Sequence, residues 1–198
     1  MTNLETLSLV LCRLWLVALC CLCSGRVMGL GEAAYISETS SKGAMPLVAP
    51  DMRARLYVDT ADFPIVQRVA RDLSADVEKV TGQSLELVHQ PQALTENAVI
   101  IGTLGRSALI EDLVQRGLVD VAAIRDRWDA FLIQQIEQPL PNVKRALVIV
   151  GANKRGTSYG VYDLSEQIGV SPWYYWADVP PAKKKSLYVT RGLSKQEA

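Results

Sequence analysis

The side chains best suited to ligand contact form an aromatic run near the end of the chain. Four consecutive aromatic residues, Trp173 to Trp176, stand between Pro172 and Asp178. Planar rings with an apolar face and a polar edge suit contact with the C–H faces of sugars, and they equally suit the packing of one domain against another. Trp173, Trp176 and Asp178 are therefore predicted to lie either at the rim of a substrate site or in a domain interface.

A second candidate is the glycine-bearing segment Gly151-Ala-Asn-Lys-Arg-Gly156-Thr157, which lies between an apolar strand pattern and a helix pattern. Its two glycines have the spacing of a phosphate-binding loop. Thr157, however, stands where that motif has the lysine that contacts the terminal phosphates. The segment therefore predicts a tight turn into a helix rather than a nucleotide site.

Other chemistries are restricted by residue type. His89 is the only histidine. This excludes a multi-histidine metal site and leaves a Ser-His-Asp triad only one possible base. His89 lies in a strand pattern, and we predict a structural or surface role for it. All four cysteines lie between positions 12 and 23, so a chain without that segment has no thiolate zinc site. Asp59 and Asp62 flank a strand-to-helix turn, where capping explains them more simply than catalysis.

Composition and the N-terminus indicate the location of the protein. Lysine plus arginine and aspartate plus glutamate both total 21, so no net field would recruit nucleic acid or an anionic membrane. The apolar stretch from Leu7 to Cys23 has an uninterrupted core shorter than the roughly 20 residues of a spanning helix. It predicts that residues 1–30 are a signal peptide or hydrophobic leader of a secreted, extracellular or periplasmic protein, without membrane contact after cleavage. An uncleaved membrane anchor is the alternative.

The elements that must position these residues follow from hydrophobic periodicity. Residues 31–52 are rich in Ser, Thr, Gly and Pro and predict a loop-rich lead-in or an edge. Strand patterns then cover 53–58, 85–89, 98–101, 130–136, 146–150 and 187–190, and helix patterns cover 62–81, 107–116 and 157–168. Asp62 is a candidate N-cap and Gly82 a stop for the first helix. Strand 146–150 is continuously apolar, which favours a central place in a sheet.

This alternation predicts an α/β fold, with a single sandwich-like domain over residues 53–192. Its sheet is mixed or mostly parallel, and helices cover it. Residues 193–198 would be a link to whatever follows.

Four blocks of sequence carry a resemblance to a known family. They are Val99-Ile-Ile-Gly-Thr-Leu-Gly105, Arg145-Ala-Leu-Val-Ile-Val-Gly151, Lys154-Arg-Gly-Thr-Ser-Tyr-Gly-Val-Tyr-Asp-Leu-Ser-Glu-Gln-Ile-Gly-Val-Ser-Pro-Trp173 and Trp176-Ala-Asp-Val-Pro180. Over essentially all of Arg53 to Thr190, the chain resembles the N-terminal domain of glycoside hydrolase family 115, the xylan α-glucuronidases.

The resemblance implies a secreted, multidomain, inverting hydrolase that removes glucuronic acid or its 4-O-methyl ether from xylan, without metal or organic cofactor. Inversion requires two carboxyl groups, which in the family belong to a barrel that follows this domain. Because the sequence stops at Ala198, we expect no catalytic residue in it and a truncated link, residues 193–198, to a missing barrel domain.

The resemblance therefore predicts a non-catalytic N-terminal domain whose partners are that barrel and a xylan-derived acidic oligosaccharide. Lys154 and Arg155 become candidate contacts for an acidic sugar, because they lie at the end of the sheet from which the last helix departs. The alternative is a stand-alone carbohydrate-binding or interaction module.

Overall fold

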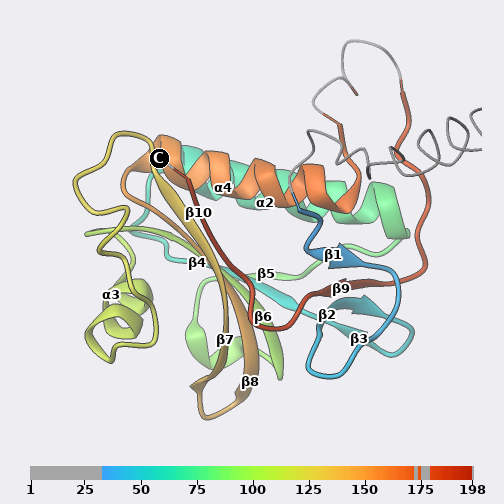
Figure 1. The fold of residues 1–198 in the computed structure, drawn as a ribbon, viewed down its shortest axis with the longest axis horizontal. Helices are drawn as coiled ribbons and strands as arrows, with labels where there is room; N and C mark the ends of the chain where they lie inside the picture. Colours follow the sequence, from blue (N-terminus) through green and yellow to red (C-terminus); the bar gives the residue numbers. More distant parts are fainter. Residues whose placement is uncertain (1–32, 172–173, 175–178, 198) are drawn as a thin grey trace, which may run out of the picture. The chain divides into compact units, whose positions relative to one another are not determined.

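The structure is a computed structural model that describes residues 33–171, 174 and 179–197 (Figure 1). The predicted leader, residues 1–30, lies outside the described residues. No helix in the described part is both long and apolar enough to cross a membrane. The chain from Ala34 onward forms one unit built around two sheets.

A six-stranded sheet in the order β10-β7-β8-β6-β4-β5 forms the centre of this unit. Within this sheet, strands β8, β6, β4 and β5 run parallel to one another. Strand β7 pairs antiparallel with β8, and β10 pairs antiparallel with β7. The strands are Arg55–Val58 (β4), Leu87–Val88 (β5), Asn97–Thr103 (β6), Phe131–Leu140 (β7), Val143–Gly151 (β8) and Ser194–Glu197 (β10). The predicted mixed sheet is confirmed, and β8 lies inside it, as its continuous apolar sequence indicates.

Helices cover both faces of this sheet (Figure 1). They are Pro64–Thr81 (α2), Ala108–Gln115 (α3), Lys154–Ile168 (α4) and the 3₁₀ turn Pro91–Ala93 (η1). Alternate residues of β6 point to opposite faces: Val99 and Ile101 join the hydrophobic cluster of α2 and α4, and Ala98 and Ile100 join that of α3. The predicted α/β class with covering helices is confirmed.

Helix α2 forms over the predicted residues, but its first turn is not capped as expected. Its buried face carries Val66, Val69, Ala70, Leu73, Asp76, Val77 and Val80. Gly82, with a left-handed φ of 76°, ends the helix as predicted. The N-cap is Phe63, which makes no side-chain cap bond. The prediction that Asp62 is the N-cap is therefore wrong, because its carboxylate is bonded elsewhere at the sheet edge.

A smaller sheet, in the order β1-β9-β2-β3, includes residues from the predicted loop-rich lead-in. Its strands are Ile36–Ser37 (β1), Met45–Ala49 (β2), Met52–Arg53 (β3) and Leu187–Val189 (β9). Met45, Leu47 and Val48 of β2 are buried in the same cluster as α2 and α4. The β2–β9 register shifts after Pro46, since proline has no N–H for a regular ladder. The described part of the lead-in, residues 33–52, thus contributes to the core, whereas its composition predicted a loop or an edge.

Residues near both ends of the described chain bind the same carboxylate of α4. Tyr35 donates a hydrogen bond from its hydroxyl group to Asp163 Oδ2 at 2.7 Å. Lys195 of β10 forms an ion pair with the other oxygen of the same carboxylate. Residues 193–198, predicted to be a link, therefore include an edge strand of the main sheet.

Two glycines allow the first turn of α4 to lie directly on the ends of the strands. A Cβ on Gly151 would lie 2.0 Å from the backbone nitrogen of Thr157, and one on Gly156 would lie 2.2 Å from the carbonyl oxygen of Ala130. Both obstacles are backbone atoms, so no side chain can turn aside to make room. These glycines serve close packing between helix and sheet.

We expect Gly151→Ala to lower the free energy of unfolding by about 3 kcal/mol or more, because the added methyl group overpacks a backbone contact. Gly105→Ala is the matched control: its Cβ would meet nothing within 4 Å, although its φ is +71°. That change should cost only about 1 kcal/mol of backbone strain. Urea denaturation of both variants measures the difference, and equal losses would contradict the packing role of Gly151.

Candidate functional site at the carboxyl edge of the parallel strands

The ends of β4, β6 and β8 lie at one edge of the sheet, and each strand is followed by a helix. In open α/β sheets, ligands bind outside the carboxyl ends of the strands. The helix N-termini at such an edge also attract negative charge. This edge is therefore where a ligand site is expected.

Asp59 is engaged in capping there. Its Oδ1 accepts a hydrogen bond from the amide of Ala61 at 2.9 Å, and its Oδ2 accepts one from the amide of Ala108 at 3.0 Å. Ala108 is the first residue of α3. The carboxylate thus caps a helix that lies far from it in the sequence, which agrees with the predicted structural role.

Asp62 connects two of the strand ends. Its Oδ1 accepts from the amide of Phe63, and its Oδ2 from the amide of Thr103 at the end of β6, both at 2.7 Å. The side chain is buried among these donors. Asp62 is therefore structural, as predicted, although it joins β6 to the β4–α2 loop instead of capping α2.

The segment that resembles a phosphate loop is closed by the chain itself. Asn153 Oδ1 accepts from the amides of Arg155 and Gly156 at 2.9 and 3.0 Å, which makes it the N-cap of α4. Thr157 is buried, and its hydroxyl oxygen lies 2.8 Å from that of Thr103. The helix begins at Lys154, three residues before the predicted start. The geometry is that of the predicted tight turn, because the amides that would hold a phosphate are already bonded.

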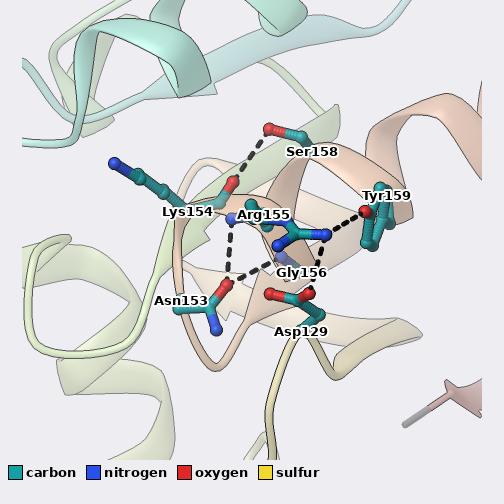
Figure 2. Close-up of polar contacts among 7 residues, drawn as sticks. All are labelled: Asp129, Asn153, Lys154, Arg155, Gly156, Ser158 and Tyr159. Atoms are coloured by element: carbon teal, nitrogen blue, oxygen red, sulfur yellow. Dashed lines mark hydrogen bonds and ion pairs between the residues drawn. The ribbon is translucent and has the colours of Figure 1, made fainter.

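The predicted cations Lys154 and Arg155 do lie at this edge, on the outside of that turn. Figure 2 shows Arg155 between Asp129 and Tyr159, with Lys154 extending in a different direction. Arg155 Nη2 lies 3.2 Å from Asp129 Oδ2 and donates to the Tyr159 hydroxyl oxygen at 2.9 Å. The hydrogen bond to Tyr159 and the charge of Asp129 raise the pKa of Arg155 above its ordinary value. Arg155 is therefore a fixed, permanent positive charge.

Lys154 belongs to a second cationic group at the same edge. Its Nζ lies 5.8 Å from the centre of the Phe63 ring, and the guanidinium carbon of Arg106 lies 4.5 Å from the same ring. Neither cation forms an ion pair with any residue that the structure describes. Sequence reasoning missed Arg106 and Phe63, because they come from separate loops that only the fold brings together.

The other predicted site residues, Trp173, Trp176 and Asp178, lie outside the described residues. Tyr174 of the same run is described, and Lys79 Nζ lies 4.9 Å from the centre of its ring. His89 is exposed, with Nδ1 at 2.9 Å from the carbonyl oxygen of Val58, which fits the predicted structural or surface role. Among the described residues, no group of His, Cys, Asp and Glu could hold a metal ion.

Sequence reasoning also missed Trp128, whose residue surface is 80% exposed. It lies in the loop before β7, directly before Asp129. In the sequence, Trp128 stands in the charged run Arg125-Asp-Arg-Trp128-Asp129.

A separate hollow of about 660 Å³ lies along α2 and α4. It is lined by Ile65, Arg68, Asp72, Asp76, Tyr162, Ser165, Val170 and Ser171. The Tyr162 hydroxyl group donates to Asp72 at 3.4 Å, and Asp76 pairs with Lys79 at 2.9 Å. Burial, and then the charge of Asp72, raise the pKa of Tyr162. Both of its carboxylates thus already have partners within the chain.

Tyr57, near the end of β4, is a buried ionisable group. Its hydroxyl group lies 3.5 Å from Asp59 Oδ2. Burial, and then the negative charge of Asp59, raise the pKa of Tyr57 from 10.0 to about 12. The folded state therefore holds this proton more tightly than the unfolded state does.

We expect an ultraviolet titration of tyrosinate to show one step near pH 12 that Tyr57→Phe removes. The contribution of the neutral Tyr57 hydroxyl group to stability is complete below pH 10 and is lost as the pH rises from 10 to about 12. The stability difference between wild type and Tyr57→Phe should fall over the same interval. A difference that does not change with pH would refute the assignment.

Asp62→Ala should lower the free energy of unfolding by about 2 to 4 kcal/mol, because two amides lose their acceptor and that of Thr103 is buried. Asp120→Ala is the control: Asp120 is exposed and accepts only from the amide of Ala122, at 2.9 Å. Its loss should be below about 1 kcal/mol. Chemical denaturation distinguishes the two, and a small loss at Asp62 would show that the Thr103 amide finds another partner.

Comparison with solved structures finds similar chains, among them a glucuronidase. Over 76% of this chain and at 25% identity, the fold matches a family GH115 4-O-methyl-α-glucuronidase with specificity for decorated arabinogalactans, with a TM-score of 0.63. The match spans only 18% of that enzyme. A second structure, CpGH84D, aligns over 83% of this chain and 24% of its own at 13% identity, but its TM-score of 0.45 is too low to support an argument.

The family comparison agrees with the structural one at the level of the domain. A search of curated proteins finds no match. The family model described as "Glycosyl hydrolase family 67 N-terminus" matches residues 48–164, which is more than half of the 198 residues. Together with the solved relative, it supports an N-terminal module of the glucuronidase type. By this match, the chain belongs to the family of glycosyl hydrolase family 67 N-terminal domains.

Proposed function

We propose that this chain is the non-catalytic N-terminal domain of a secreted xylan α-glucuronidase, nearest to glycoside hydrolase family 115. The whole enzyme removes glucuronic acid or its 4-O-methyl ether from xylan. The assignment to family 115 rests on the four sequence blocks that resemble it, and the solved relative belongs to that family. Secretion rests on the apolar stretch from Leu7 to Cys23.

The state of the carboxylates at the carboxyl edge carries the non-catalytic assignment. Inverting hydrolysis needs one carboxyl group that protonates the leaving oxygen and a second that activates water. Asp59 and Asp62 accept backbone amides at this edge, and Asp129 is paired with Arg155. Each of these acids already holds the fold together. A catalytic pair is therefore better placed on the barrel of the whole enzyme.

The exposed cations give this domain a supporting role at the rim of the active site or in the interface with the barrel. Lys154 and Arg155 are charged and face solvent, as a group that contacts an acidic sugar must. Trp173, Trp176 and Asp178 stay candidates for a rim or interface on sequence grounds. Tyr174 of their run lies against Lys79 near the end of α2, whereas Lys154 lies against Phe63 at its start. The partners proposed are a xylan-derived acidic oligosaccharide and the catalytic barrel.

The purified 198-residue chain should release no glucuronic acid from xylo-oligosaccharides that carry 4-O-methylglucuronic acid. A complete family 115 α-glucuronidase in the same buffer is the positive control, and chromatography of free uronic acid is the measurement. Because the described carboxylates at the edge serve the fold, we expect no signal above buffer at any pH at which the chain is folded. Turnover by the chain alone would overturn the non-catalytic assignment.

A further inference from the structure

Trp128 is a solvent-exposed tryptophan in an ordered loop. Its residue surface is 80% exposed, although burying an aromatic ring of this size is strongly favourable. The preceding turn is anchored by Ile124, which is buried, and by hydrogen bonds from the amides of Ile124 and Arg125 to the carbonyl oxygen of Val121 at 3.1 and 2.9 Å. The exposure therefore belongs to an ordered surface.

The backbone on both sides of Trp128 adopts an uncommon conformation. Asp126 and Asp129 have left-handed φ values of 64° and 59°, which cost on the order of 1 kcal/mol each in non-glycine residues. The carboxylate of Asp129 is held by Arg155. On the other side of that guanidinium group lies Tyr159, which is 45% exposed (Figure 2). The exposed Tyr159 thus lies beside a fixed ion pair, and the exposed Trp128 directly precedes the acid of that pair in the chain.

The arginines of this loop have no ion-pair partner among the described residues, whereas one of its aspartates does. Arg125 and Arg127 are exposed and form no ion pair with a described residue. Asp126 is the only acidic residue between them, and Asp129 is already paired. The surface next to Trp128 therefore carries surplus positive charge, which complements a carboxylate.

We propose that this surface, made of Trp128, Tyr159, Arg125, Arg127 and the Asp129–Arg155 pair, binds an acidic polysaccharide chain. The indole ring packs on the C–H face of a sugar, and the arginines attract the carboxylate of a uronic acid. The inference rests on the proposed function, since that function supplies a substrate with uronic acid groups. It adds a binding surface separate from Lys154, which lies against Phe63 at the start of α2.

A protein partner fits this surface less well. Stable protein interfaces bury about 800 Å² per partner around a core depleted of charged residues. Here Trp128 lies between Arg127 and Asp129 in the sequence, and the Arg155 guanidinium group lies between Asp129 and Tyr159. One exposed ring among charges suits a narrow glycan chain, which needs a stacking face and hydrogen-bonding groups rather than a broad apolar area.

The test is calorimetric titration of the full chain with a xylo-oligosaccharide bearing one 4-O-methylglucuronic acid, and with the same oligosaccharide lacking it. Wild type should bind the acidic probe more tightly. Trp128→Ala should weaken binding of both probes by about tenfold or more through loss of stacking. The double change Arg125→Gln and Arg127→Gln should weaken binding of the acidic probe alone.

Tyr162→Ala is the matched control, because Tyr162 is also an exposed aromatic residue of α4, at 48%, but lines the separate hollow. It should leave both affinities unchanged. Circular dichroism checks that each variant is folded, and sedimentation measures its oligomeric state.

Three results would overturn the inference: unchanged affinity in folded Trp128→Ala, no binding by wild type, or a loss of self-association in Trp128→Ala without an effect on sugar. The last result would assign Trp128 to a contact between proteins. None of them would alter the no-turnover expectation. Conversely, turnover by the chain alone would overturn the non-catalytic assignment and leave the binding result standing.

Discussion

The position of α4 depends on a direct contact between backbone atoms at the turn that joins β8 to α4. Gly151 and Gly156 carry no Cβ, so the first turn of the helix lies directly on Gly151 and Ala130 without a side chain between them. This contact fixes the position of α4, and α4 in turn determines the rest of the edge. It turns Thr157 inward toward Thr103, leaves Lys154 and Arg155 outside, and places Asp163 where both ends of the described chain attach.

The electrostatics of the carboxyl edge follow from that geometry. Helix N-termini attract negative charge, and this chain meets the demand with its own oxygens, from Asp59 at α3 and Asn153 at α4. An acidic ligand at this edge therefore encounters guanidinium and ammonium groups on the surface, rather than the backbone amides that a phosphate loop would offer. Recognition here depends on side chains, which sequence change alters more easily than backbone.

Features that depend on local pattern could be predicted from the sequence. The valines of α2 recur at helical spacing and Gly82 follows them, so the helix and its end were both visible. The continuous apolar run in β8 indicated its place inside the sheet. The position of Lys154 and Arg155 at the sheet edge followed from the order of strand, turn and helix alone.

Features that depend on distant residues could not be predicted. Strand β2 looked like a loop because Pro46 interrupts it and its partner β9 comes from the other end of the domain. The true partners of Asp62 are set by the adjacency of β4 and β6, so its cap position was misjudged. Trp128 was overlooked because exposure is a property of the folded surface, and the loop's left-handed aspartates are invisible in composition.

Strands from the beginning of the domain pair with strands from its end, which affects how the domain folds during its synthesis. Strands β1 and β2 pair with β9, and the far edge of the main sheet is β10, at the end of the described chain. Contacts of such long sequence separation form late, since the intervening chain must first be ordered. During synthesis, β2 can pair with β3 at once, but its other edge stays open until β9 emerges, when nearly the whole domain has been made.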